Sequence, residues 1–99
     1  MLAQTIVDIK DLDEAGEFLK GFLTDSEYEA FSKRLAIAYW LKKGRSYNNI
    51  KENLKVSSAT IAAVQQVMGR TGFTQAIKKI EAEEWANQWS EKIKKFVGK

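Results

Sequence analysis

Residues 46–66 read SYNNIKENLKVSSATIAAVQQ, and the spacing of their apolar side chains predicts a helix-turn-helix. Ile50 and Leu54 lie four residues apart, so they share one face of a short first helix. Val56 follows as the apolar residue of the turn, and Ser57 is suited to cap a second helix. The second helix then carries further apolar residues at steps of three and four. In such a pair the second helix can enter the major groove of DNA.

The composition favours a small all-α protein. The chain has 99 residues, of which 44% are hydrophobic and 29% charged, and it contains no proline. Because proline is the strongest helix breaker, its absence agrees with a helical chain. We expect a single domain over residues 1–99, with the helix-turn-helix at about 46–68 and an additional C-terminal helix at about 74–97.

The residues that are missing argue against an enzyme. The chain has no cysteine and no histidine, which excludes disulfides, thiolate or imidazole metal ligands and a Ser–His nucleophile. We therefore expect no catalytic residues, no cofactor and no metal site. The longest apolar run, residues 35–41, is too short to cross a bilayer, and no segment resembles a signal peptide. These features predict a cytoplasmic protein without a membrane partner.

Charge is divided unevenly along the chain. Residues 1–31 hold eight acidic and two basic side chains, whereas residues 32–80 hold ten basic side chains and one acidic one. Residues 81–99 are balanced, with four of each. The basic block coincides with the predicted helix-turn-helix, as a surface that binds phosphates requires.

The helix that precedes the helix-turn-helix has clear start and stop signals. Thr24 and Glu27 fit a capping box, and Gly44 follows the last helical position, Lys43. Apolar residues fall on more than one face of this helix, which therefore needs burial on several sides. In a chain of this size, that pattern predicts a partner subunit.

A final helix is expected to open at Thr74 and to reach about Val97. Its apolar residues recur at steps of three, four and five, and they include Trp85 and Trp89. We expect these tryptophans to pack in the core and the dimer interface. Two alternatives are that this helix covers a ligand pocket or binds a partner protein.

The stretch FLTDSEYEAFSKRLAIAYWLKKGRSYNNIKENLKVSSATI, residues 22–61, resembles the tryptophan repressor family, particularly its YerC/YecD branch. The matching features are Leu-Thr before an acidic helix start, the pair Lys33-Arg34, and Gly44 before Ser46. The signature SY..I...L.VS.ATI completes the match, which covers roughly residues 5–64. The resemblance implies an all-helical, intertwined homodimer that binds double-stranded DNA and regulates transcription as a repressor does.

The resemblance also implies an effector pocket, of which this chain keeps a part. Arg34 matches one of the two arginines that hold the indole of tryptophan in the family, and Thr24 matches a threonine that lines the pocket. Ala63 stands where the second arginine is expected. Losing that arginine removes both stacking and charge, so tryptophan is not expected as the corepressor. Arg34 is then interpreted as a structural or phosphate-facing residue, and another small-molecule corepressor stays open.

The predicted DNA surface has two parts. Ser58, Ala59 and Ala62 are expected to point toward the groove, beside Thr60, and such small side chains predict modest sequence discrimination. The phosphate anchors are expected to be Arg45, Tyr47, Asn48, Lys51, Lys55 and Ser57. Lys55 replaces the glycine that is usual in such a turn, and a left-handed conformation there costs about 1–2 kcal/mol.

Because of that strain, a second hypothesis stays open. In this hypothesis the chain is a helical protein-interaction or dimerisation module whose helix-turn-helix no longer binds DNA.

Overall fold

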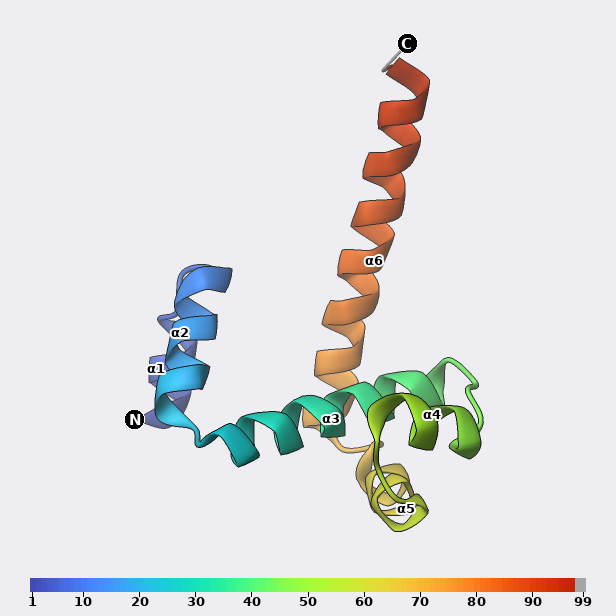
Figure 1. Ribbon diagram of the computed structural model, residues 1–99. Helices are drawn as coiled ribbons and strands as arrows, with labels where there is room; N and C mark the ends of the chain where they lie inside the picture. The colour runs from blue at the N-terminus through green and yellow to red at the C-terminus, as the bar shows by residue number, and fades with distance from the viewer. Residues whose placement is uncertain (98–99) are drawn as a thin grey trace. The chain divides into compact units, whose positions relative to one another are not determined.

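The computed structural model describes residues 1–97, and at 89, 93 and 95–97 it describes the backbone alone. Six helices and no strand occur within residues 1–97, which confirms the all-α prediction (Figure 1). The helices are α1 (Leu2–Val7), α2 (Leu12–Phe22), α3 (Asp25–Lys42), α4 (Tyr47–Leu54), α5 (Ser58–Val67) and α6 (Thr71–Val97). The expected packing of the Trp89 side chain lies outside the described residues.

The chain forms two compact units, Met1–Lys33 and Arg34–Lys99, with the division inside α3. The single-domain interpretation therefore stays a prediction.

Side-chain caps set the helix starts of the first unit. Asp11 Oδ1 accepts a hydrogen bond of 2.9 Å from the Glu14 amide at the start of α2. The predicted capping box is confirmed before α3, because the Thr24 amide donates to Glu27 Oε1 at 2.8 Å and the Glu27 amide donates to Thr24 Oγ1 at 3.1 Å. Neither α1 nor α2 buries a residue.

The second unit has a core of six buried apolar residues drawn from the C-terminal half of α3 and from α4, α5 and α6. These residues are Ile37, Ala38, Ile50, Ile61, Val64 and Ile77. Partly buried side chains, including Leu54, Val56 and Phe73, pack around them. The apolar spacing of residues 46–66 thus supplies half of this core.

Gly44 ends α3 as predicted. Its φ of +83° lies in the left-handed region, which a glycine adopts without steric cost. The Arg45 amide donates to the Trp40 carbonyl at 3.1 Å, and the Gly44 amide donates to the Leu41 carbonyl at 3.0 Å. This pair of bonds is a Schellman motif, which turns the chain from α3 toward α4.

The last helix begins at Thr71 and not at Thr74, so the prediction of its start is wrong by three residues. Thr74 lies inside the first turns of α6, where its hydroxyl donates to the Thr71 carbonyl at 3.0 Å. A threonine has the same hydrogen-bonding groups at a cap and in a first turn, so its presence does not separate the two positions.

Two ion pairs connect α6 to Lys42, the last residue of α3, and to Lys43, which follows it. Lys42 Nζ lies 3.3 Å from Glu81 Oε1, and Lys43 Nζ lies 3.7 Å from Glu84 Oε1. A hydrogen bond with Glu84, assisted by burial and by the charges of Glu84 and Glu81, raises the pKa of Tyr39 to about 12. The end of α3 is therefore coupled to the first half of α6.

Candidate nucleic-acid interface

Each helix of the α4–α5 pair starts at a serine cap. Ser46 Oγ accepts from the Asn49 amide at 3.1 Å, and Ser57 Oγ accepts from the Thr60 amide at 3.1 Å. The Ser57 and Thr60 hydroxyls also lie 2.9 Å apart. Both predicted caps are confirmed, and the Ser57 cap defines the start of the second helix.

The turn between the helices contains a left-handed lysine. Lys55 is the C-cap of α4, with φ 57° and ψ 50°, and it is the one non-glycine residue with a positive φ within residues 1–97. The chain reverses at this residue while the half-buried Val56 packs against the core. The left-handed conformation considered for Lys55 is thus present, and it carries a conformational cost of about 1–2 kcal/mol.

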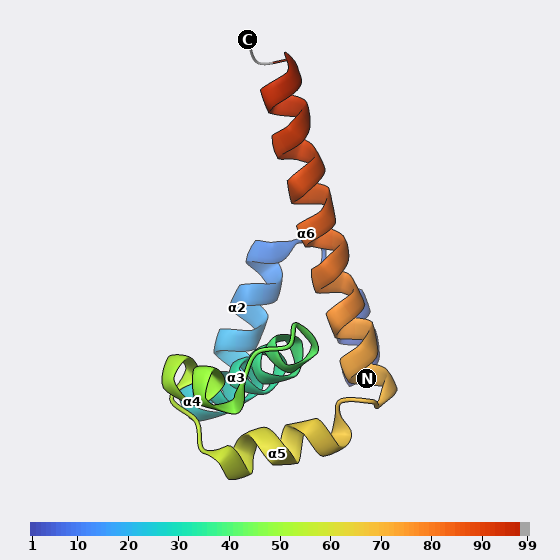
Figure 2. The ribbon, with the colours of Figure 1, turned by 90° about the vertical axis from the view of Figure 1, so that its right-hand side faces the viewer.

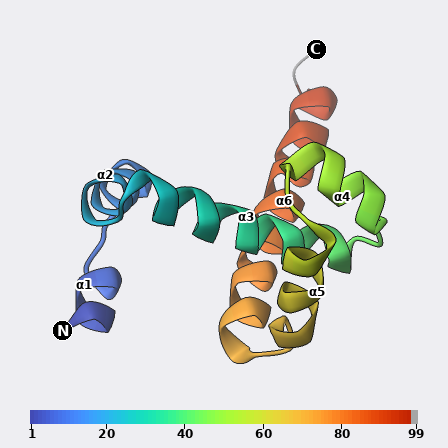
Figure 3. The same cartoon turned by 60° about the horizontal axis from the view of Figure 1, so that its bottom comes forward.

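The inner faces of α4 and α5 hold the pair together. Ile50, Ile61 and Val64 are buried in one core, so the two helices share an apolar interface. Figure 3 shows the course of the two helices and of the turn that joins them. The Tyr47 hydroxyl also donates a hydrogen bond to Gln65 Oε1, which links the start of α4 to the end of α5. Tyr47, predicted as a phosphate anchor, therefore has a bracing contact inside the motif.

The N-terminal part of the outward face of α5 consists of small side chains. Ser58, Ala59 and Thr60 are exposed, and Ala62 is half-buried. Ala63 is exposed as well. None of these side chains is long enough to prevent another molecule from approaching the helix backbone closely.

Gln66 belongs to this face, and the sequence-based prediction does not include it. It is exposed and lies seven residues after Ala59 and three after Ala63, so the three side chains share one side of the helix. A glutamine amide can both donate to and accept from an adenine edge. The spacing of seven residues between Ala59 and Gln66 was the signal in the sequence that could have predicted this placement, because seven residues make two helical turns.

Polar and cationic side chains are exposed on α4 and in the segments on either side of it. Arg45, Asn48, Lys51 and Lys55 are exposed along α4 and at both its ends. The Arg45 guanidinium carbon lies 3.9 Å from the centre of the Trp40 ring, and Arg45 Nη1 donates to Asn49 Oδ1 at 3.3 Å. Arg45 is thus held in position, whereas none of the described contacts tethers the ammonium groups of Lys51 and Lys55.

Comparison with known proteins bears on this arrangement. The family model described as "Trp repressor protein" matches residues 1–81, most of the chain. The chain belongs to the Trp repressor family. The uncharacterized protein YerC of Bacillus subtilis (strain 168) is 28% identical over 85 residues, covering 84% of this chain and 82% of YerC. No solved structure matches.

Membership of the Trp repressor family agrees with the geometry of α4 and α5. The family indicates a helix-turn-helix regulator that binds DNA. The Trp repressor family is a family of regulators and not of enzymes. Among the side chains that the structure describes, no three potential ligands form a group able to hold a metal ion. Within the same residues, no helix is long and apolar enough to span a membrane.

The three residues predicted for a family-type effector pocket belong to different units, Thr24 to the first and Arg34 and Ala63 to the second. The Thr24 hydroxyl caps α3 in the first unit. In the second unit, the Arg34 guanidinium lies 5.3 Å from the centre of the Phe73 ring, and Ala63 is exposed on α5. Arg34 therefore stacks on a residue of α6, and the structural or phosphate-facing role expected for it stays a prediction.

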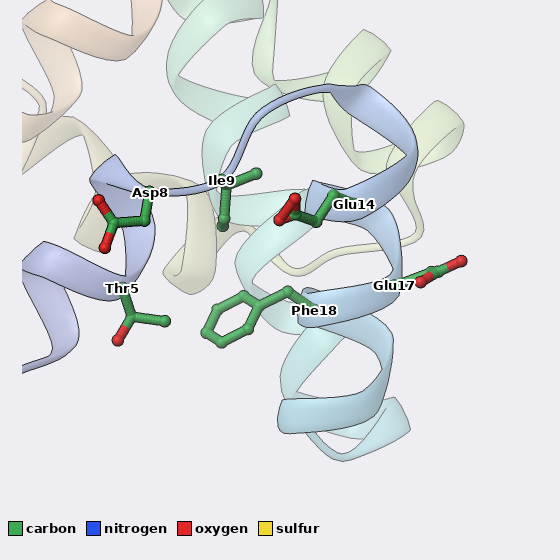
Figure 4. Close-up of a pocket in the computed structure, with 6 residues that line it drawn as sticks. All are labelled: Thr5, Asp8, Ile9, Glu14, Glu17 and Phe18. Atoms are coloured by element: carbon green, nitrogen blue, oxygen red, sulfur yellow. The ribbon is translucent and has the colours of Figure 1, made fainter.

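An open cavity of about 530 Å³ lies between α1 and α2 (Figure 4). Its lining residues are Thr5, Asp8, Ile9, Glu14, Glu17 and Phe18. The Phe18 ring points toward α1, whereas the Glu17 carboxylate points away from it. None of the predicted effector residues lines this cavity.

Proposed function

We propose that the protein is a homodimeric transcriptional repressor that binds double-stranded DNA in a sequence-specific manner, with α5 in the major groove. The observations that carry this proposal are the exposed side chains of Ser58, Ala59 and Ala63 on α5 and the exposed cations Lys51 on α4 and Lys55 in the turn between the two helices. Small side chains let a helix approach base edges closely, and cations beside it neutralise phosphates.

The start of α5 is suited to hold a phosphate. The helix has ten residues, and the positive end of its dipole lies at Ser57 and Ser58. Exposed amides of the first turn and the Ser58 hydroxyl can donate to phosphate oxygens. Arg45, Asn48 and Lys51 then fix the position of the motif along the DNA backbone.

Base reading in this proposal uses few groups. Ser58 can bond to several bases, Ala59 and Ala62 can touch thymine methyl groups, and Gln66 can pair with adenine. The chain has no arginine on α5, so a two-bond contact to guanine is absent from this surface. We therefore expect a specificity that depends on adenine and thymine steps and on DNA shape.

The homodimer is supported by the apolar surface of the first unit. Leu12 is 86% exposed and Phe22 is 63% exposed, and neither α1 nor α2 buries any residue. Phe31, in the same unit, is also exposed. A second copy that covers these side chains supplies the burial that the unit lacks, as the interlocked subunits of the family do.

The proposed repressor does not use free tryptophan as its corepressor. Ala63 provides neither charge nor a flat group, and the Arg34 guanidinium is engaged by Phe73. Tryptophan is therefore expected to leave the DNA affinity unchanged.

A salt titration of binding to mixed-sequence duplex DNA tests the proposal. We expect affinity to fall steeply with salt, and Lys51→Glu to weaken binding to every duplex. Lys10→Glu is the matched control, because it makes the same charge change at an exposed residue between α1 and α2. Absence of binding at low salt would contradict the proposal and favour the protein-interaction module.

A further inference from the structure

The segment 43–46 joins the end of α3 to the start of α4 (Figure 2), and it contains Arg45, a cation of the proposed DNA surface. The Schellman motif fixes the backbone of Arg45, because its amide donates to the Trp40 carbonyl at 3.1 Å. Arg45 is exposed, so a ligand from outside the chain can reach its side chain. The backbone of this residue is thus fixed, and its guanidinium is accessible.

Two neighbours hold the guanidinium of Arg45. Its central carbon lies 3.9 Å from the centre of the Trp40 ring, compared with 5.3 Å for Arg34 over Phe73. An indole ring attracts a guanidinium by its charge and accommodates its planar shape. From α4, Asn49 Oδ1 accepts a hydrogen bond of 3.3 Å from Arg45 Nη1. The guanidinium is therefore held by the last turn of α3 and the first turn of α4.

The two neighbours are themselves fixed in the second unit. Trp40 is half-buried and packs against the hydrophobic core. The Asn49 amide donates to the capping oxygen Ser46 Oγ, and the Asn49 carbonyl accepts from Asn53 Nδ2 at 2.8 Å. Trp40 and Asn49 therefore restrict the rotamers of Arg45 before any ligand binds.

These contacts leave much of the guanidinium free to donate. A guanidinium carries several N–H groups in a rigid fork, which matches the oxygens of a phosphate. The described contacts use an N–H group of Nη1. The edge formed by Nε and Nη2 can then donate to a pair of oxygens of one phosphate.

We propose that Trp40 and Asn49 are positioning residues for DNA binding, which hold the Arg45 guanidinium ready for one phosphate. This inference rests on the proposed function and adds to it the residues that prepare one of its contacts. A long side chain loses conformational freedom when it binds a phosphate, and that loss lowers affinity. Arg45 is already restrained in the free protein, whereas none of the described contacts tethers the ammonium groups of Lys51 and Lys55.

A double-mutant cycle in the full chain tests this inference, with binding to a mixed-sequence duplex as the readout. Trp40→Leu removes the ring and keeps the backbone bond to Arg45. We expect its affinity at constant salt to fall about two- to tenfold for each protomer. The slope of log affinity against log salt should stay unchanged, because Arg45 still neutralises a phosphate. Arg45→Ala should instead make that slope shallower by about 0.9 for each protomer.

The cycle separates a positioning role of Trp40 from a structural one. In the Arg45→Ala background, Trp40→Leu is expected to cause no further loss of affinity, because no guanidinium is left to position. Trp40→Phe should restore most of the affinity, since it returns a ring beside the guanidinium. A loss of equal size with and without Arg45 would overturn the inference.

Two more variants separate the ring contact from an effect on the fold. Tyr39→Leu is the matched control for Trp40→Leu, because Tyr39 is also half-buried against the core and its ring lies 5.3 Å from Lys43 Nζ. We expect Tyr39→Leu to leave the DNA affinity unchanged. Asn49→Ala alters an exposed residue and removes the second contact, so we expect about a threefold loss for each protomer with an unchanged slope. Asn49→Ala decides the question if circular dichroism shows that Trp40→Leu does not fold.

Failure of this inference is distinguishable from failure of the DNA proposal. Absence of binding by the unaltered protein at low salt would overturn both. Binding by the unaltered protein, with the same affinity in Trp40→Leu and in Asn49→Ala, would overturn the positioning role alone. Equal losses in Trp40→Leu and Tyr39→Leu would also overturn it, because they would indicate a general effect on α3.

Discussion

Replacing the left-handed lysine of the turn separates the stability of the helix-turn-helix from its affinity for DNA. Lys55 has φ 57° and ψ 50°, a conformation that costs a side-chain-bearing residue about 1–2 kcal/mol. Lys55→Gly removes that strain, but it also gives the unfolded chain more freedom, which offsets about 0.4–1 kcal/mol. We therefore expect a net gain of about 0.5–1 kcal/mol in the free energy of unfolding.

The same substitution removes a cation from the proposed phosphate surface. For each phosphate that the protein no longer neutralises, the slope of log affinity against log salt becomes shallower by about 0.9, hence by about 1.8 in a homodimer. A gain of about 0.5–1 kcal/mol corresponds to a rise in Tm of about 2–8 °C for a domain of this size. The expected phenotype is thus a protein that is more stable and binds DNA more weakly.

Two assays and two controls check this pair of effects. Thermal unfolding, at one fixed protein concentration, gives the Tm, and fluorescence anisotropy of a labelled duplex at several salt concentrations gives the slope. Lys51→Gly removes an exposed lysine from the interior of α4 and is expected to destabilise by about 1 kcal/mol. Lys55→Asn removes the charge and tolerates the left-handed region, so it tests the slope alone. A lower Tm for Lys55→Gly would refute the strain argument, and an unchanged slope would refute the phosphate contact.

Three further predictions concern the cap, the α3–α6 contact and the dimer. Ser57→Ala is expected to lower the free energy of unfolding by about 1 kcal/mol in chemical denaturation, because the Thr60 amide then has no acceptor. Ser58→Ala is the control and is expected to leave the free energy of unfolding unchanged. Equal effects of the two substitutions would contradict the role of Ser57 as a cap. Between pH 10 and about 12 the Tyr39 hydroxyl ionises in the unfolded chain before it does in the folded one, so the stability that it contributes is lost as pH rises through this range. Tyr39→Phe should flatten that part of the pH profile of denaturation, and an identical profile would count against the contact with Glu84. Phe22→Glu is expected to convert the dimer to monomers in sedimentation, and an unchanged mass would exclude this surface as the interface.

Features of this fold that depend on neighbouring residues were predictable from the sequence. The Thr24–Glu27 box and the Ser57 cap each require residues three apart, and both form. Gly44 and Lys55 are left-handed because the chain must reverse within one or two residues. Interactions between residues close in the sequence determine the local backbone geometry, so they can be predicted from the sequence.

Contacts between distant residues were not predictable in the same way. The stacking of Arg34 on Phe73 and the bond from Tyr47 to Gln65 depend on how helices pack, which side-chain spacing does not specify. The start of α6 is not predictable to within a turn, because a threonine at a cap and one in a first turn look alike in sequence. Gln66 lies beyond the run of small residues that defines the predicted surface of α5, so only the helical spacing reveals it.

The most direct test of the central claim is a selection of bound sequences from a random duplex library. The proposed homodimer predicts an enriched palindrome whose half-sites lie about one helical turn apart, with adenine at the base pair that Gln66 reaches. Gln66→Ala should relax the preference at that base pair and leave the spacing of the half-sites unchanged. A flat distribution from the unaltered protein would contradict the claim that α4 and α5 read DNA sequence.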